Sequence, residues 1–201
     1  LARMKLKSPN AGYAPDFVSK VMKPLAKDIA AKGIKVVSNA GGVNVDACRD
    51  ALVAALDEIG VNLKVAVVHG DEISGLADDL RAEGTVEMFS GAKMPAHLTS
   101  VNAYLGAAAI AQAFRDGADV VITGRVVDSA TVLGPLMSEF GWTAEDYDQL
   151  SAGSLVGHLL ECGPQVTGGI FTDWRDVSGW DDMGFPVAVC HPDGSFDLTK
   201  P

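Results

Sequence analysis

A short apolar run, Val120-Val121-Ile122, constrains the fold of this chain more than any other feature. Its side chains point to both faces of a strand, so both faces must be buried, as in a parallel sheet. A small turn, Thr123-Gly124, and then Arg125 and Asp128-Ser129 follow it. In parallel sheets ligands bind beyond the carboxyl ends of the strands, where side chains and helix N-termini converge. The run therefore predicts a sheet and a binding site at its edge.

The order strand, small polar turn, helix occurs three times along the chain. Strands are predicted at Ile34–Ser38, Leu63–Val68 and from Val120 to Ile122. Alternation of this kind implies right-handed crossovers and a parallel sheet. We therefore predict an α/β fold, a Rossmann-like three-layer parallel sheet with a small C-terminal β extension. The core domain is expected to span residues 1–166, and residues 167–201 are expected to form the extension packed on it.

Capping residues, glycines and helical spacing predict the remaining elements. Leu1–Pro15 is expected to be a connecting arm, and Pro24 to kink or divide the first helix. The predicted helices are Asp16–Ala31, Asn44–Ile59, Gly75–Glu83, Asn102–Arg115, one starting at Asp128, and one starting at Ser151 or Ser154 and ending at Glu161, after an acidic loop at Trp142–Gln149. The tail is predicted to form strands at Phe185–Cys190 and Phe196–Thr199 around a Pro-Asp-Gly turn.

Charge and cysteine content exclude several classes of partner. A formal net charge of −10 and a pI near 4.7 argue against a surface for nucleic acid or anionic membrane. The three cysteines are odd in number, far apart and without a CxxC motif, which indicates a reducing compartment, the cytoplasm. No window reaches the roughly 18 apolar residues that a membrane helix needs.

Polar side chains follow each predicted strand, and together they predict a pocket. Asn39 and Asn44 follow the first strand, Asp71 the second and Arg125 the third. Because the carboxyl ends of parallel strands meet at one edge, these amides, this carboxylate and this cation are expected to line one pocket for a small molecule. The predicted binding set also includes Gly41, Gly42, Gly124, Asp128 and Ser129. The alternative is that Asn44 and Asp128 only cap helices and the glycines only allow tight turns.

No nucleotide-binding fingerprint is present. The chain contains neither G-x-G-x-x-G nor G-x-x-x-x-G-K-[ST], so neither a dinucleotide site nor a P-loop is expected. Gly41-Gly42 before a helix could hold a phosphate through backbone N–H groups, which is a weak signal alone. No cofactor is predicted apart from the CoA moiety of a substrate.

His158, Glu161 and Cys162 fall on one face of a predicted helix, at i, i+3 and i+4. They could form a thiol with a histidine partner or three ligands of a metal. Because a cysteine is most often a small buried residue and Gly163-Pro164 marks a helix end, a structural role is favoured and no metal is predicted. His69 and Asp71 form a second pair that lacks a third ligand.

Four blocks of sequence resemble one known family. They are Ser38–Asn44 (SNAGGVN), Val67–Asp71 (VVHGD), Ile122–Ala130 (ITGRVVDSA) and Gly157–Gly163 (GHLLECG). In these blocks and their order the chain resembles the acyclic terpene utilisation protein AtuA family, over nearly its whole length. The resemblance implies a fragment that lacks both termini of the family, corresponding to the central part of its N-terminal domain.

The resemblance also implies a role and a set of site candidates. The role is bacterial catabolism of citronellol- and geraniol-type compounds, or related branched acids, through CoA thioesters. The matching positions are Asn39, Gly41, Gly42, Asp71, Arg125, Asp128, His158, Glu161 and Cys162. His69 stands where the family is expected to have an acidic or other residue, which argues against a role for that side chain.

Two functions of different class follow from these observations. In the first, an enzyme acts on a branched acyl-CoA or carboxylic acid by a hydratase- or lyase-like step; Arg125 binds the anionic group, and Asp71 or His158 moves a proton. In the second, the chain is a non-catalytic scaffold or binding subunit of a complex that processes CoA thioesters, with an apolar patch around Trp174–Phe185. A homo-oligomer is expected for the enzyme.

Overall fold

The computed structural model covers residues 1–201 and divides into two compact units. Unit 1 comprises Leu1–Leu105 and Gly117–Val126, and unit 2 comprises Gly106–Asp116 and Val127–Pro201. Unit 1 holds the parallel sheet, whereas unit 2 holds a group of helices and a hairpin. The boundary expected after residue 166 lies inside unit 2.

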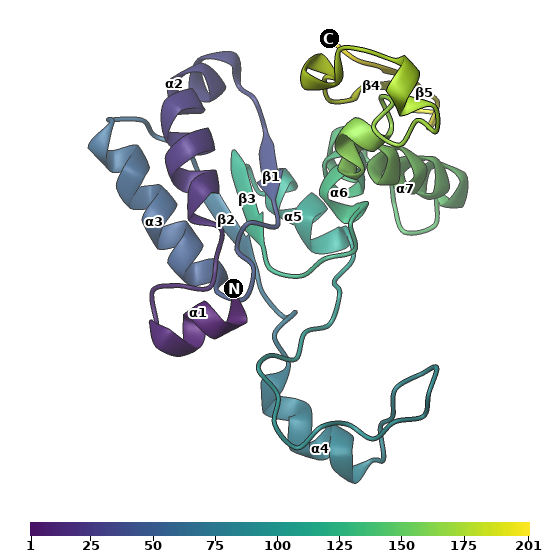
Figure 1. Cartoon of the computed structure of the whole chain (residues 1–201). Coiled ribbons are helices and arrows are strands. Elements are labelled where there is room, and N and C mark those ends of the chain that lie inside the picture. The colour runs from purple at the N-terminus through teal and green to yellow at the C-terminus, as the bar shows by residue number, and fades with distance from the viewer. The chain divides into compact units, whose positions relative to one another are not determined.

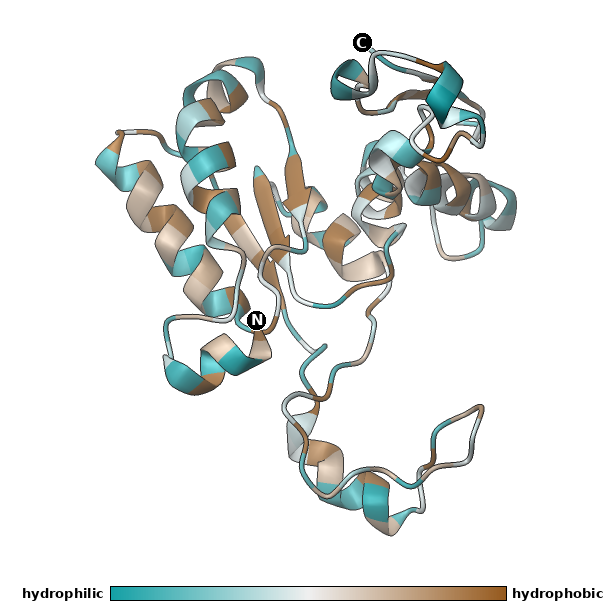
Figure 2. Cartoon of the chain, viewed as in Figure 1, coloured by the Kyte–Doolittle hydropathy of each residue, from teal (hydrophilic) through white to brown (hydrophobic).

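Unit 1 is built on a three-stranded parallel sheet in the order β1-β3-β2 (Figure 1). The strands are β1 (Val36–Ser38), β2 (Val65–Val68) and β3 (Val120–Thr123). All four residues of the central strand β3 are buried, as the apolar run predicts, and Figure 2 shows the strands as strongly hydrophobic. The predicted parallel sheet is confirmed, but a Rossmann-like three-layer arrangement is not.

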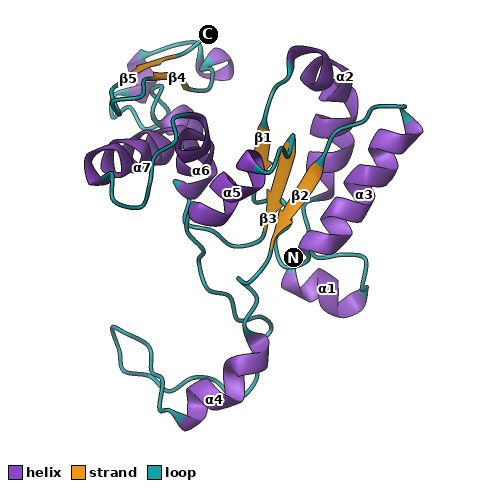
Figure 3. Cartoon of the chain, turned by 180° about the vertical axis from the view of Figure 1, so that it is seen from behind, coloured by secondary structure: helices purple, strands orange, loops and turns teal.

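Two long helices cover one face of this sheet. The helical elements of unit 1 are α1 (Ala2–Lys7), η1 (Phe17–Met22), α2 (Lys23–Lys32), α3 (Val45–Glu58), η2 (Ser74–Leu76) and α4 (Ala77–Ala82). Met22, Ile29 and Leu52 from these helices share one buried cluster with Val120 and Ile122. Because Val120 and Ile122 lie two residues apart on β3, they point to the same face, so α2 and α3 pack on that face, side by side in Figures 1 and 3.

Pro24 and Gly33 mark the start and the end of helix α2. The helix predicted from Asp16 is divided, as expected: the π-helical turn η1 ends at Met22, and Pro24 occupies the first turn of α2. A proline is tolerated there because its missing N–H has no partner within the helix. Gly33 ends α2 with φ 64. Asp16 does not cap the helix; its carboxylate pairs with Lys20 at 3.1 Å. The arm predicted for Leu1–Pro15 contains the short helix α1.

Unit 2 packs three helices closely and adds the predicted hairpin. Its elements are α5 (Ala108–Arg115), α6 (Ala130–Glu139), α7 (Tyr147–Glu161), η3 (Gly163–Gln165), η4 (Trp174–Asp176), η5 (Trp180–Asp182), β4 (Val187–Cys190) and β5 (Phe196–Thr199). A Cβ on Gly134 of α6 would lie 2.5 Å from Ile110 Cγ2 of α5, so this glycine lets the two helices approach. β4 and β5 pair antiparallel, which confirms the β character of the tail. None of the helices combines the length and apolarity needed to cross a bilayer.

Three helices of the chain start at positions that differ from the predicted ones. α5 starts at Ala108 rather than Asn102, because Asn102 forms a bridge with Glu72 in an antiparallel pairing. α6 starts after Ser129, so Asp128 is not its N-cap. α7 starts at Tyr147, within the predicted acidic loop, because the Asp146 carboxylate accepts hydrogen bonds from the N–H and hydroxyl of Thr143 at 2.6 and 2.8 Å and fixes the turn before the helix.

The buried thiol of Cys48 should make the stability of the protein fall at high pH. Burial within the α2–α3 cluster raises the pKa of Cys48 from 9.0 to about 11. Since the folded pKa is the higher one, its contribution is complete below pH 9 and is lost as the pH rises through about 11. Urea unfolding at about pH 8 and about pH 11 should show a loss on the order of 2 kcal/mol that Cys48→Ala no longer shows. An equal loss in both proteins would contradict this assignment.

Candidate functional site

The turns that follow the three strands of unit 1 lie at one edge of the sheet. In the parallel register Ser38 pairs with Ile122 and Val68 pairs with Thr123. The strands therefore end together, and the turns beginning at Asn39, His69 and Gly124 leave the sheet on the same side. The prediction that these remote segments share an edge is confirmed.

Asp71, which follows the outer strand β2, is a buried carboxylate at this edge. It is 4% exposed, and its Oδ2 accepts hydrogen bonds from the backbone N–H of Arg125 at 2.8 Å and from Asn102 Nδ2 at 3.0 Å. A Cβ at Gly124 would lie 2.4–2.6 Å from the carboxylate atoms of Asp71. The space beside Gly124 is therefore occupied by a side chain of the protein itself, and Asp71 positions the backbone of Arg125.

Arg125 presents an exposed cation from this anchored backbone. Its guanidinium carbon lies 4.6 Å from the ring centroid of Tyr104, and its Nη2 donates a hydrogen bond to the Tyr104 hydroxyl. Its backbone carbonyl accepts a hydrogen bond from the Leu105 N–H at 3.2 Å. No carboxylate of unit 1 forms an ion pair with the guanidinium, so its remaining donors face solvent. A planar cation held on an aromatic ring suits a carboxylate or phosphate.

The turn after β1 is held by the protein chain. A Cβ on Gly41 would lie 2.6 Å from the Thr123 carbonyl oxygen, and one on Gly42, whose φ is 58°, would lie 2.5 Å from Leu1 Cδ1. The Gly42 N–H donates to the Asn39 carbonyl at 3.1 Å. Asn39 is exposed and its amide remains available to a ligand. Packing and turn geometry thus account for both glycines.

Both polar atoms of the Asn44 side chain form hydrogen bonds within the protein. Its Oδ1 accepts a hydrogen bond from the Ala47 N–H at 3.5 Å, which confirms that it caps α3. Its Nδ2 donates to the carbonyl oxygens of Pro9 at 2.8 Å and Ala11 at 2.7 Å. Asn44 therefore joins the N-terminal arm to the start of α3, and its side chain has little capacity left for a ligand.

A cavity of about 540 Å³ lies beside this turn in unit 1. It is bordered by α1, by Val43 and Asn44 after β1, by Glu72 and Ser74 after β2, and by the returning segment 99–100. Ser74 hydrogen-bonds to Glu72 and, together with a smaller effect of the Lys5 cation, holds the pKa of Glu72 below its usual value. Of the three predicted turns, only the one after β1 contributes to this cavity, through Val43 and Asn44, and neither Asp71 nor Arg125 is part of its lining.

Asp128 and Ser129 belong to unit 2, at the start of α6. A Cβ on Gly157 of α7 would lie 2.7 Å from the Ser129 carbonyl oxygen and 2.9 Å from its Cα. Ser129 is therefore a close contact between α6 and α7. Asp128 is exposed, and its carbonyl accepts a hydrogen bond from the Thr131 hydroxyl at 3.1 Å.

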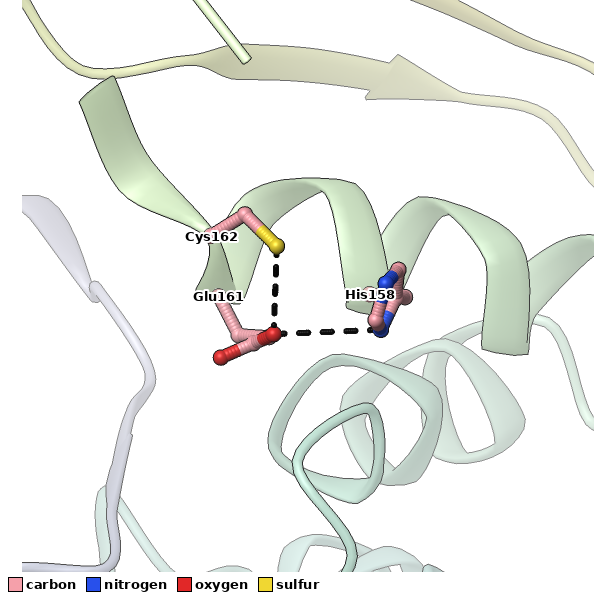
Figure 4. A group of neighbouring side chains, drawn as sticks. All are labelled: His158, Glu161 and Cys162. Carbon is pink, nitrogen blue, oxygen red and sulfur yellow. Dashed lines mark hydrogen bonds and ion pairs between the residues drawn. The ribbon is translucent and has the colours of Figure 1, made fainter. Parts of the chain in front are cut away.

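His158, Glu161 and Cys162 meet at the end of α7, also in unit 2 (Figure 4). Glu161 Oε1 lies 3.8 Å from His158 Nδ1 and accepts a hydrogen bond from Cys162 Sγ at 3.3 Å. That hydrogen bond, burial and the charges of Glu161 and Asp128 raise the pKa of the Cys162 thiol. The helix spacing thus brings the three side chains together, as predicted.

Two residues of the Arg125 site are missed by reasoning from the sequence, Asn102 and Tyr104. Both lie within the predicted helix Asn102–Arg115, whose small residues favour a helix. In the structure, segment 101–103 instead pairs antiparallel with segment 71–73. The Ile73 N–H donates to the Val101 carbonyl at 2.9 Å, and the Ala103 N–H donates to the Asp71 carbonyl at 2.7 Å. The sequence offers one signal for them: Asn102 and Tyr104 are polar residues placed just before the alanine-rich helix α5.

The two tryptophans of the tail, Trp174 and Trp180, form different contacts. Trp180 Nε1 donates to the carbonyls of Trp174 and Val177, and Trp180 borders a cavity of about 290 Å³ that also includes Phe171 and Lys200. Trp174 is half-exposed and stacks with Arg175, whose guanidinium carbon lies 4.5 Å from the ring centroid. The tail thus has a small cavity of its own.

Comparison with known families decides what kind of chain carries these sites. A family model described as acyclic terpene utilisation family protein AtuA matches residues 1–201. The chain belongs to the AtuA family. Membership in this family suggests a role in the utilisation of acyclic terpenes, and it confirms the resemblance seen in the four sequence blocks. No curated protein and no solved structure matches the chain.

Proposed function

We propose that this AtuA-family chain acts in an enzyme whose substrate is a branched acyl-CoA or the corresponding carboxylic acid, by a hydratase- or lyase-like step. The observation that carries the proposal is the exposed Arg125 guanidinium, supported by Tyr104 and fixed through its backbone by buried Asp71. A cation held in this way can bind a carboxylate or phosphate, or stabilise a carbonyl oxygen as it gains negative charge.

The side chains at this edge of the sheet have different proposed roles. Water addition to a double bond conjugated with a carbonyl places negative charge on that oxygen and requires a proton at the neighbouring carbon. Arg125 would stabilise the oxygen, and the exposed Asn39 amide would donate a further hydrogen bond. The Tyr104 hydroxyl, next to the guanidinium, is the group proposed to give its proton to that carbon, and the resulting phenolate takes back a proton from the attacking water. Asp71 acts as a positioning residue, because its Oδ2 already accepts hydrogen bonds from Asn102 Nδ2 and from the backbone N–H of Arg125.

Hydration of a branched 2-enoyl-CoA in isotopically labelled water tests this function. The expected result is incorporation of labelled oxygen into the acyl chain, and a higher melting temperature with the CoA ester, because a ligand that binds only the folded state stabilises it. Tyr104→Phe should lower the rate by roughly 100-fold while the ligand still raises the melting temperature. Tyr147→Phe, at an exposed tyrosine of unit 2, is the control and should keep the full rate. Absence of turnover and of any thermal shift with acyl-CoAs and free acids would refute the proposal.

A second candidate function, a scaffold or binding subunit of a complex that processes CoA thioesters, is favoured by the apolar surface of the tail. Ile170, Trp174 and Phe185 are 73%, 51% and 67% exposed. Exposed apolar groups of this size are typical of contacts with another protein. Size-exclusion chromatography with a turnover assay separates the two functions: a homo-oligomer that hydrates an acyl-CoA without another chain rules out the scaffold.

A further inference from the structure

The end of α7 collects three side chains of different ligand type on one face. His158, Glu161 and Cys162 offer an imidazole nitrogen, a carboxylate oxygen and a thiol sulfur, and these donor atoms all lie within 4.8 Å of one another (Figure 4). His158 is 68% exposed and Glu161 is 32% exposed, so an ion can reach the group from solvent. The cluster lies within unit 2 and does not depend on the function proposed for Arg125.

The distances in this cluster are close to those of a chelate. Ligands of a tetrahedral zinc ion, at roughly 2.0–2.3 Å from the metal, are separated from each other by roughly 3.3–3.8 Å. Glu161 Oε1 lies 3.3 Å from Cys162 Sγ and 3.8 Å from His158 Nδ1. The carboxylate is thus already at ligand spacing from the other two donors, and small rotations of the exposed His158 side chain complete the triangle.

The surroundings of the cluster favour a cation. Cys162 is the C-cap of α7, where the unpaired carbonyl groups of the helix end give a partial negative charge. The close contact between Gly157 and Ser129 fixes the start of α6 beside α7. The Glu161 carboxylate forms an ion pair with His158 and with no lysine or arginine, so its charge is available to a metal cation.

We propose that His158 Nδ1, Glu161 and Cys162 Sγ bind a Zn²⁺ ion with a fourth position open to water. Nitrogen, sulfur and oxygen donors together suit zinc, whereas Ca²⁺ and Mg²⁺ require oxygen ligands. On binding, the Cys162 thiol releases its proton to solvent and its thiolate replaces a water molecule of the ion. Three protein ligands with an open position form a site that can activate water or polarise a carbonyl, rather than a closed structural site.

Cobalt(II) titration of the metal-free protein tests this site, because a cobalt–thiolate bond gives a charge-transfer absorption. The expected result is one Co²⁺ per chain with this absorption, and its loss when Zn²⁺ is added. Cys162→Ser should abolish the absorption, and competition with a chelating dye should show Zn²⁺ affinity lower by at least roughly 100-fold in Cys162→Ser and His158→Gln. If Cys162→Ser does not fold, the Zn²⁺ affinity of His158→Gln still tests the site.

Cys190 and His191 provide the matched control, because they are a cysteine and a histidine of the same unit that do not belong to the cluster. Cys190→Ser and His191→Gln should keep both the absorption and the Zn²⁺ affinity. The proposal is overturned if the absorption persists in Cys162→Ser, if the control variants lose it equally, or if neither metal binds the native chain.

Discussion

Arg125→Ala is expected to lower the affinity of the protein for an acyl-CoA or branched carboxylic acid by roughly 100-fold, with almost no change in melting temperature. The guanidinium can form two charge-assisted hydrogen bonds to one carboxylate, and at this exposed position we expect a total contribution of about 2.8 kcal/mol, which is a 100-fold change in affinity. The anchor of this position is the backbone N–H bonded to Asp71, which alanine retains. Ligand binding and folding should therefore separate at this residue.

Isothermal titration with the ligand and thermal unfolding without it measure the two quantities. Arg175→Ala is the matched control, because Arg175 is also a cation stacked on an aromatic ring but lies in the tail. Arg125→Lys should restore only part of the affinity, since lysine keeps the charge and loses the planar fork. A large drop in the melting temperature of Arg125→Ala would show that the side chain is structural, and unchanged affinity would exclude it from the site.

Gly124→Ala is expected to destabilise unit 1 by about 3 kcal/mol, the sum of overpacking and the loss of buried hydrogen bonds. The added Cβ would lie 2.4 Å from Asp71 Oδ2, the atom that accepts both hydrogen bonds from Arg125 and Asn102. The carboxylate is 4% exposed and cannot move into water without leaving these donors. For a chain of this length the melting temperature should fall by roughly 6–12 °C.

Gly75→Ala is the control for this substitution, because a Cβ at Gly75 meets nothing within 4 Å and its φ is not positive. It should be neutral or slightly stabilising. The double variant Gly124→Ala/Asp71→Gly should lose less stability than the sum of the two single variants, because removal of the carboxylate leaves space for the methyl group. Strict additivity would show that the clash is not the cause.

The sheet and its binding edge could be predicted because their signals are local. Val120-Val121-Ile122 is apolar on both parities, and all of β3 is buried. The neighbourhood of Asp71 and Arg125 followed from the rule that parallel strands end together, and the hydrogen bond between them agrees with it. Of the predicted helix N-caps, Asn44 at α3 is confirmed. The prediction for Asp16 is wrong, because its carboxylate pairs with Lys20 instead of capping the helix.

The contents of the site could not be predicted because they depend on long-range contacts. The glycine at position 124 indicates a close approach, but the sequence does not say that the approaching group is Asp71 rather than a ligand. Tyr104 was assigned to a helix, since the pairing of segments 71–73 and 101–103 joins residues about thirty positions apart and leaves no periodic pattern. The division into two units, which the chain crosses after Leu105, after Asp116 and after Val126, likewise has no sequence signal.

The antiparallel pairing between segments 71–73 and 101–103 has a consequence for the evolution and engineering of this chain. Two backbone hydrogen bonds and the bridge between Glu72 and Asn102 hold the two legs together, and the chain between them carries η2 and α4. Because these contacts lie at the base, we expect that residues 77–98 can be shortened or replaced without a change in the register of Asp71 and Tyr104. Insertions at the tip of the segment should therefore disturb the Arg125 site less than substitutions in the paired segments at its base.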